Sequence, residues 1–469
     1  MKRLVIFLLS LSGSGFSWAE SKNPLPLTEV LSSVTSRYPP YLAALIEMDI
    51  ANGRARQAQG AFDLNLSISG SFKPSGYYDG QSGMAILDQP LPFWGGNVYG
   101  GYRLSSGFLP NYNKDRTQGD GEAVLGFKLN LLRDGSIDRR RVALYQARID
   151  QELADPFILR QHLDFIRAAS LAYYNWLGAG YRWQIAEQLL RVAKDRDKGI
   201  AEQASRGAVA PIVRVDNERL VVSREIAVVQ TRRRFEAASI ELSLFHRDAQ
   251  DQPILSSRAR LTPSFPVPAR PDTSRLSGDI AKAMIFRPEI RRLDLVLEKA
   301  GLDRRLAKNN LMPNLDLGVQ ASQAAGERNQ SDIEPLEIEA KIELKVPLQR
   351  NEAKGRLETL DAQINRLQAE RDFARDRISA DVRDALSAVD AAFQQIAQTE
   401  RNVELAQQLE EAENTRFQQG AADLFTLQIR EQATFDARLI AIEAQADYLR
   451  SLANYRAAIA ADAPASLAR

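Results

Sequence analysis

Histidine and cysteine, which supply most zinc ligands and many nucleophile–base pairs, are scarce in this chain. His162 and His246 are the only histidines among 469 residues, both lie in helical patterns, and there is no cysteine. Zinc sites and nucleophile–base pairs are built mainly from such residues at matched spacings. No glycine-rich phosphate-binding motif is present either. We therefore expect no catalytic residue, no metal site and no cofactor, so the chain is predicted not to be an enzyme.

Most charged residues are expected on the solvated faces of helices. Acidic residues such as Glu410, Glu411 and Glu413 follow a helical pattern, as on a solvated helix face. The 61 Lys+Arg residues balance 60 Asp+Glu, for a net charge of +1. Because a nucleic-acid-binding surface needs excess positive charge, no nucleic acid is expected as a partner.

In one short segment, charged residues alternate with apolar ones. Apolar residues at alternate positions from Leu336 to Val346 are separated by five charged residues: Glu337, Glu339, Lys341, Glu343 and Lys345. This period of two places the two sets on opposite sides of a sheet. A strand that is apolar outside and charged inside suits the wall of a water-filled transmembrane barrel, so these five residues are predicted to face the lumen. A soluble antiparallel sheet packed on a core would show the same pattern.

Three further segments alternate in the same way, around residues 64–69, 123–131 and 315–322. Four strands per chain are too few, because bacterial membrane barrels need about eight or more. Several chains must share one barrel. Two copies would give a barrel filled by its own side chains, whereas three or more leave a lumen.

The chain repeats itself. Arg37–Ser71 parallels Phe286–Ser322 at an offset of about 250 positions, and Arg141–Ile149 parallels Arg356–Ile364 at about 215. The first half must therefore contain extra sequence between its strands. That sequence, residues 73–120, is rich in Gly, Tyr, Asn and Pro and is predicted to be a long loop.

The N-terminus has the pattern of a secretory signal. Lys2 and Arg3 precede an apolar run over 4–11, and small residues lead to a predicted cut after Ala19. An N-terminal membrane anchor is the alternative, but the run has about half of the ~20 residues that a spanning helix needs. The predicted divisions are a signal peptide (1–19), a first repeat (20–247), a Pro-rich linker (248–274), a second repeat (275–462) with a hairpin over 314–346, and a tail (463–469).

Each strand pair is followed by an unusually long helical pattern. One covers about 136–206, broken only by Pro156, and the other covers about 351–419 without proline. Nearly 70 residues at 1.5 Å each reach about 100 Å. Both patterns end at a glycine that precedes a second helix, as at the tip of a helical hairpin, near 207 and near 420.

Aromatic residues gather in two places. Tyr173, Tyr174, Trp176, Tyr181 and Trp183 are predicted to pack between helices rather than to bind a ligand. Phe93, Trp94 and Tyr99 lie in the predicted loop and could line the rim of a barrel.

The order of elements and the two tips resemble the TolC-like outer membrane efflux protein family, over about residues 27–460. The most specific segments are Arg206-Gly207 followed by 211–218, and Arg416 to Gly420 followed by 423–428. The resemblance implies an α+β membrane protein with two structural repeats per chain. In it, a homotrimer shares one transmembrane β-barrel of twelve strands, four per chain, continued by a long coiled-coil-like α-helical barrel.

The same resemblance implies location and partners. The protein is expected in the cell outer membrane, in contact with its lipid, and to extend into the periplasm towards an adaptor protein and an inner-membrane pump. The adaptor-docking and gating tip would comprise Arg206, Gly207, Arg416, Gly420, Asp423, Thr426 and Gln428. Where some relatives carry gating aspartates, this chain has Thr426 and Ile429, so the gating residues are not identified.

The predicted function is a passive duct from periplasm to exterior in a tripartite efflux or type I secretion system. The alternative is a periplasmic coiled-coil adaptor or scaffold without a pore. Neither the exported substrate nor the particular pump follows from the sequence.

Overall fold

The computed structural model describes residues 23–110, 116–327 and 333–464, so the predicted signal peptide and residues 465–469 of the tail lie outside it. The chain forms two compact units. Of the described residues, the helical unit comprises 23–45, 158–288 and 375–464, and the sheet unit comprises 46–110, 116–157, 289–327 and 333–374. Each unit draws on both predicted repeats. Within the described ranges, no helix has the length and hydropathy needed to cross a bilayer.

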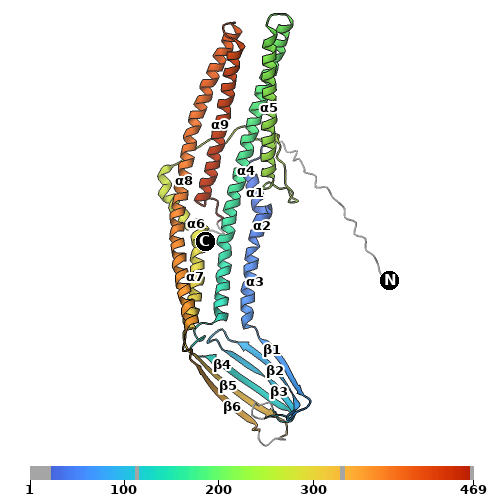
Figure 1. Cartoon of the computed structure of the whole chain (residues 1–469), viewed down its shortest axis with the longest axis vertical. Coiled ribbons are helices and arrows are strands. Elements are labelled where there is room, and N and C mark those ends of the chain that lie inside the picture. Colours follow the sequence, from blue (N-terminus) through green and yellow to red (C-terminus); the bar gives the residue numbers. More distant parts are fainter. Residues whose placement is uncertain (1–22, 111–115, 328–332, 465–469) are drawn as a thin grey trace, which may run out of the picture. The chain divides into compact units, whose positions relative to one another are not determined.

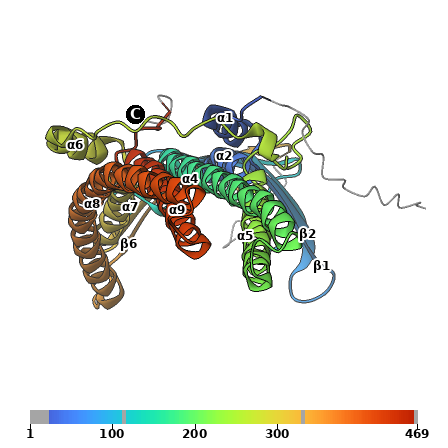
Figure 2. The same ribbon diagram turned by 90° about the horizontal axis from the view of Figure 1, so that it is seen from above.

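The helices occur in corresponding order in the two halves (Figure 1). The first half contains α1 (Leu27–Arg37), α2 (Pro39–Leu45), α3 (Glu47–Gln59), α4 (Arg139–Ser205) and α5 (Pro211–Ser243). The second half contains α6 (Leu276–Phe286), α7 (Pro288–Asn309), α8 (Asn351–Gln418) and α9 (Leu424–Ala458). In the helical unit the long helices follow one another in the order α8, α9, α4, α5 in both views (Figures 1 and 2).

The strands form one antiparallel sheet in chain order. They are β1 (Asn65–Lys73), β2 (Asp79–Pro90), β3 (Asn97–Phe108), β4 (Gly121–Asn130), β5 (Asn314–Ala325) and β6 (Leu336–Lys345). The two halves meet where β4 pairs with β5. Helices and an antiparallel sheet in separate parts of the chain confirm the predicted α+β class.

The prediction of four strands per chain is wrong, because the described part contains six. The segment 73–120, predicted to be a loop, contains β2 and β3. In β2 the apolar run 84–87 puts apolar side chains on both faces, so no alternation is visible. In β3, glycines interrupt the alternation. Gly101 is needed because a Cβ there would lie 2.1 Å from the carbonyl oxygen of Ala85.

The predicted break at Pro156 does not occur, and α4 runs through it. A proline inside a helix removes one backbone hydrogen bond and crowds the preceding turn. Packing on both sides of it compensates, since Ile149 belongs to the core of the sheet unit and Ile166 to the core of the helical unit.

The helices of the sheet unit are held by a small core and a ring of ion pairs. Val142 and Ile149 of α4 pack against Leu295 and Leu302 of α7. Around them are the pairs Lys299–Asp150 (2.5 Å), Arg291–Glu152 (2.6 Å), Arg371–Asp294 (2.7 Å) and Arg304–Asp361 (2.5 Å). Exposed pairs contribute little each, so the apolar contacts are the main stabilising term.

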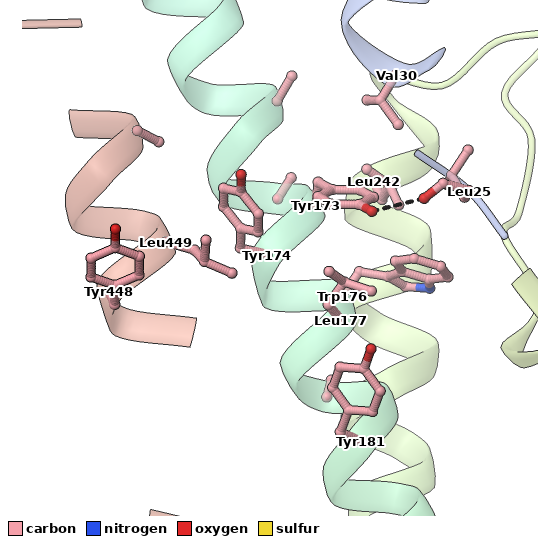
Figure 3. Packing of buried hydrophobic residues seen from close by; sticks show 14 of the residues in the cluster. Leu25, Val30, Tyr173, Tyr174, Trp176, Leu177, Tyr181, Leu242, Tyr448 and Leu449 are labelled. Atoms are coloured by element: carbon pink, nitrogen blue, oxygen red, sulfur yellow. Dashed lines mark hydrogen bonds between the residues drawn. The ribbon is translucent and has the colours of Figure 1, made fainter. Parts of the chain in front are cut away.

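The core of the helical unit is aromatic. Trp176 and Leu177 of α4 are fully buried, and Leu242 of α5 lies against them (Figure 3). The hydroxyl of Tyr173 donates a 2.7 Å hydrogen bond to the carbonyl of Leu25, which fixes the segment before α1 (Figure 3). Tyr174 and Tyr181 are in the same core and Trp183 packs on it, so the predicted packing role of these aromatics is confirmed.

The linker, predicted over 248–274, is attached to the helical unit at several points. The hydroxyl of Tyr181 donates to the carbonyl of Thr262 (2.7 Å), and that of Tyr448 donates to the carbonyl of Ala269 (2.8 Å). Gly180 makes room for the linker, because a Cβ there would lie 2.5 Å from Leu261. The linker therefore connects the halves while packing on their helices.

Both histidines are buried in the helical unit. His246 lies 3.1 Å from Glu29, which also binds Arg260 at 2.9 Å, and Arg37 lies near. Burial lowers the pKa of His246, and it does so against the attraction of Glu29. His162, near the backbone carbonyl of Asp462, also has a pKa lowered by burial. Both side chains are thus neutral in the folded protein at neutral pH.

We expect the helical unit to lose stability as the pH falls below about 6.5, the ordinary histidine pKa. There the unfolded chain binds protons that the folded chain takes up only at lower pH, which favours unfolding. Thermal unfolding of the detergent-solubilised protein, followed by circular dichroism at pH 7.5 and 5.5, measures this loss. The double variant His162→Gln, His246→Gln should show a smaller difference between the two pH values; an equal difference would assign the loss to carboxylates.

Candidate functional site

The sheet has one apolar and one polar face. Residues directly opposite in a ladder point to the same side, and the register therefore assigns every side chain. The apolar face carries Leu66, Ile68, Phe72, Ala85, Leu87, Val98, Tyr102, Leu104, Phe108, Ala123, Leu125, Phe127, Leu129, Leu315, Leu317, Val319, Ala321, Leu336, Ile338, Ala340, Ile342 and Leu344. Its polar exceptions are Asp79, Gln81, Gln89, Ser106 and Gln323. The polar face carries Ser67, Ser69, Ser71, Asp88, Asn97, Tyr99, Arg103, Glu122, Lys128, Asp316, Gln320, Ser322 and the five charged residues of β6.

On β4 and β5 the apolar face is more exposed than the polar face, which is the reverse of a soluble protein, whereas on the edge strands β1 and β6 both faces are exposed. On β4, Leu125 of the apolar face is 63% exposed, whereas Glu122 of the polar face is 7% exposed. Ile68 and Ile338 of the apolar face are 76% and 69% exposed. Met84, Ile86 and Val124 are apolar exceptions on the polar face. An apolar surface of this extent marks contact with a partner or a membrane.

Cross-strand contacts organise the polar face. Arg103 of β3 pairs with Glu122 of β4 at 2.7 Å, and Lys128 of β4 pairs with Asp316 of β5 at 3.1 Å. The Tyr99 hydroxyl crosses β4 and donates to Gln320 of β5 at 3.0 Å. Gly126 permits this crossing, because a Cβ there would lie 2.5 Å from the Tyr99 ring.

The five residues predicted to face a lumen lie together on the polar face of β6. Four of them are exposed and Glu343 is half-buried, with its carboxylate 2.6 Å from the Lys345 ammonium. Arg103 and Glu122 were missed, because their pairing depends on a register that the sequence does not reveal. Tyr99, considered as a rim residue of a loop, instead lies in β3 and bonds to Gln320. Within the described residues, no three His, Cys, Asp or Glu side chains gather as metal ligands would.

The two tips, both in the helical unit, have the same backbone geometry. Gly207 and Gly420 have φ of +73° and +72°. The amide of Ala208 donates to the carbonyl of Gln203 (2.9 Å), and that of Ala421 donates to the carbonyl of Arg416 (2.8 Å). These are Schellman caps, in which the left-handed glycine ends one helix so that the next can begin. The predicted tips at 207 and 420 are thus turns with the same backbone conformation and hydrogen bonds.

The predicted tip residues have different surroundings. Arg206 pairs with Glu202 on the surface. The Arg416 guanidinium contacts Glu413 and donates to the carbonyl of Ala421, both at 3.3 Å. Thr426 is half-buried and Gln428 is buried, whereas Ile212 and Phe425, at corresponding positions after the two glycines, are 68% and 64% exposed. Sequence reasoning did not single out these two exposed apolar residues.

Asp423 begins α9 as its N-cap. Its carboxylate accepts a 2.7 Å hydrogen bond from the Thr426 amide, and this bond lowers the pKa of Asp423. We expect Asp423→Ala to destabilise the start of α9 by about 1 kcal/mol, the usual contribution of an N-cap. Amide hydrogen exchange over residues 424–427 would measure this, with Asp423→Asn as the matched control. Equal protection in the Ala and Asn variants would contradict a capping role.

A second polar cluster joins three helices below the tips. Arg196 of α4 binds both carboxylate oxygens of Glu431 on α9, and Arg224 of α5 contacts Gln432 of α9. Glu431 is 7% exposed. These residues were not predicted, since nothing in their spacing shows which helices become neighbours.

The chain is similar in sequence and in fold to known membrane proteins. Residues 280–461 match the sequence model of the family described as outer membrane efflux protein. The resemblance to the TolC-like outer membrane efflux proteins is confirmed. Among curated proteins, no sequence matches.

Solved structures of membrane proteins have the same fold. One is a membrane protein from Pseudomonas aeruginosa (14% identity, 97% of this chain and 96% of that chain, TM-score 0.69). Another is the outer membrane protein VceC from Vibrio cholerae (15% identity, 92% and 95%, TM-score 0.65). A third is the CmeC outer membrane channel from Campylobacter jejuni (12% identity, 98% and 93%, TM-score 0.66).

The family match also bears on location and function. The match of residues 280–461 to a family of outer membrane proteins supports the predicted location in the cell outer membrane, with an extension into the periplasm. The matched family is described as one of outer membrane efflux proteins, and this is the coarse function that the comparison supports.

Proposed function

We propose that the chain is one subunit of a homotrimeric passive duct in a tripartite efflux or type I secretion system. The observation that carries the proposal is the reversed polarity of the sheet, whose apolar face is exposed while its ion pairs lie on the opposite face. Lipid would cover the exposed apolar face, and water would solvate the ion pairs on the polar face. The polar residues of β6, from Glu337 to Lys345, then line the lumen.

Association of several copies is supported in both units. In the sheet unit, β1 and β6 are the two edges of the sheet, so each offers backbone groups to a neighbouring chain. In the helical unit, α5 carries an exposed apolar stripe at helical spacing: Val215, Val222, Ile226 and Val229. A second copy of the chain would cover this stripe. The number of three copies rests on the family resemblance.

The tips suit a docking role. Ile212 and Phe425 are exposed next to the two rigid glycine turns, where an apolar contact with a helical adaptor can form. The adaptor then connects the duct to an inner-membrane pump, which supplies the energy.

Fractionation followed by electrophoresis with and without boiling tests the proposal. A heat-sensitive trimer recovered from the outer membrane is the expected result. A monomer in the soluble periplasmic fraction would contradict the duct and favour the adaptor or scaffold, which has no pore.

A further inference from the structure

The hairpin β2–β3 lies between two strands that would otherwise be neighbours. In the second half, β5 leads through one connection into β6, and the two strands pair directly. In the first half, β1 pairs with β2 and β4 pairs with β3. The first half therefore contributes four strands to the sheet where the second contributes two.

In the hairpin, β3 has the same two faces as the rest of the sheet, whereas β2 adds Ala85 and Leu87 to the apolar face together with polar residues at its two ends. On the apolar face, Leu87, Tyr102 and Leu104 are 46%, 38% and 51% exposed. The register places Leu87 opposite Leu66 of β1, and Tyr102 opposite Ala123 of β4. A surface loop in water would have no reason to align its apolar side chains with those of neighbouring strands.

The polar face also includes the hairpin. Its strand β3 is joined to β4 by the Arg103–Glu122 pair and to β5 by the hydrogen bond from Tyr99 to Gln320. The second contact spans a whole strand, over Gly126. These polar contacts would be lost if the hairpin left the sheet.

We infer that β2 and β3 are part of the membrane wall, so that the trimer closes a barrel of eighteen strands rather than twelve. This inference rests on the proposed trimeric duct. Barrel diameter grows about linearly with strand number, and the lumen is therefore about 1.5 times as wide as that of a twelve-stranded barrel. Such a lumen would admit bulkier substrates through the membrane section of the duct.

Disulfide cross-linking can distinguish the two arrangements, because the chain has no cysteine of its own. Ser69 of β1 lies directly opposite Met84 of β2 on the polar face. In the second half, Gln320 of β5 lies opposite Glu339 of β6. The corresponding residues of the first half are Ser69 of β1 and Val124 of β4. These two would therefore be opposite each other if β1 paired directly with β4. In the six-stranded sheet, three strand spacings, about 14 Å, separate Ser69 from Val124, which is too far for a disulfide.

The expected result is that oxidation of membranes cross-links the variant Ser69→Cys, Met84→Cys within one chain and leaves Ser69→Cys, Val124→Cys unlinked, as read by mass spectrometry of the linked peptides. A cross-link in the second variant, or none in the first, would overturn the inference. Electron cryomicroscopy of the purified protein gives an independent count. A three-fold ring of eighteen strands supports the wider barrel, and a three-fold ring of twelve overturns it while leaving the duct intact. A soluble monomer would instead defeat the proposed function.

Discussion

Replacing Ile68 with arginine should remove most of the heat-sensitive trimer from the outer membrane. Ile68 lies in the middle of β1 on the apolar face and is 76% exposed. An arginine on the lipid side of a membrane barrel costs about 2–4 kcal/mol near the bilayer midplane. The cost applies to every copy in the trimer. Quantitative fractionation, with unboiled electrophoresis of the membrane fraction, measures the effect.

The neighbouring residue provides the control. Ser69 is also exposed, but it lies on the polar face of the same strand. Ser69→Arg should leave the amount of trimer near that of the unmodified protein, because its guanidinium stays in water. Equal losses from the two variants would mean that the two faces do not differ in environment, contrary to the account.

Replacing Gly420 with glutamate should impair export while leaving trimer assembly intact. At φ of +72° a residue other than glycine is strained by about 1–2 kcal/mol, although open space surrounds the site. A carboxylate at the end of α8 also opposes the helix dipole. The turn at the second tip should therefore change shape, and the adaptor would lose its docking surface. Trimer yield and the transport phenotype of cells that depend on this chain are the two measurements.

A conservative variant separates conformation from charge. Asparagine tolerates the left-handed region better than other non-glycine residues, and we therefore expect Gly420→Asn to retain most of the export. Normal export by Gly420→Glu would show that the tip geometry does not matter. Loss of the trimer in that variant would instead place Gly420 in assembly.

The sequence predicted those elements whose signals are local. The strands β1, β4, β5 and β6 show a period of two, and the caps at Gly207 and Gly420 follow from helix-end chemistry. The strands β2 and β3 were missed because their glycines serve close backbone approach and because Met84 and Ile86 add apolar side chains to the polar face. Close approach between backbones, and the face on which a side chain lies, are determined only when the neighbouring strands are paired.

In the candidate sites, too, only features within a single element could be predicted from the sequence. The charged residues of β6 could be predicted because they lie in one strand. The Arg103–Glu122 pair, the bond from Tyr99 to Gln320 and the Arg196–Glu431 pair join segments that are distant in sequence. Their pairing follows from strand register and helix packing, which a single sequence does not specify.

The most direct measurement of the central claim is the current through the purified protein in a planar bilayer, with single cysteines at adjacent positions of β6. Lys341→Cys lies on the polar face and Ile342→Cys on the apolar face. The account predicts discrete channels whose current falls when a bulky charged thiol reagent modifies the cysteine at position 341 and does not change for position 342. Absence of channels, or a block from position 342 alone, would contradict a duct lined by the polar face.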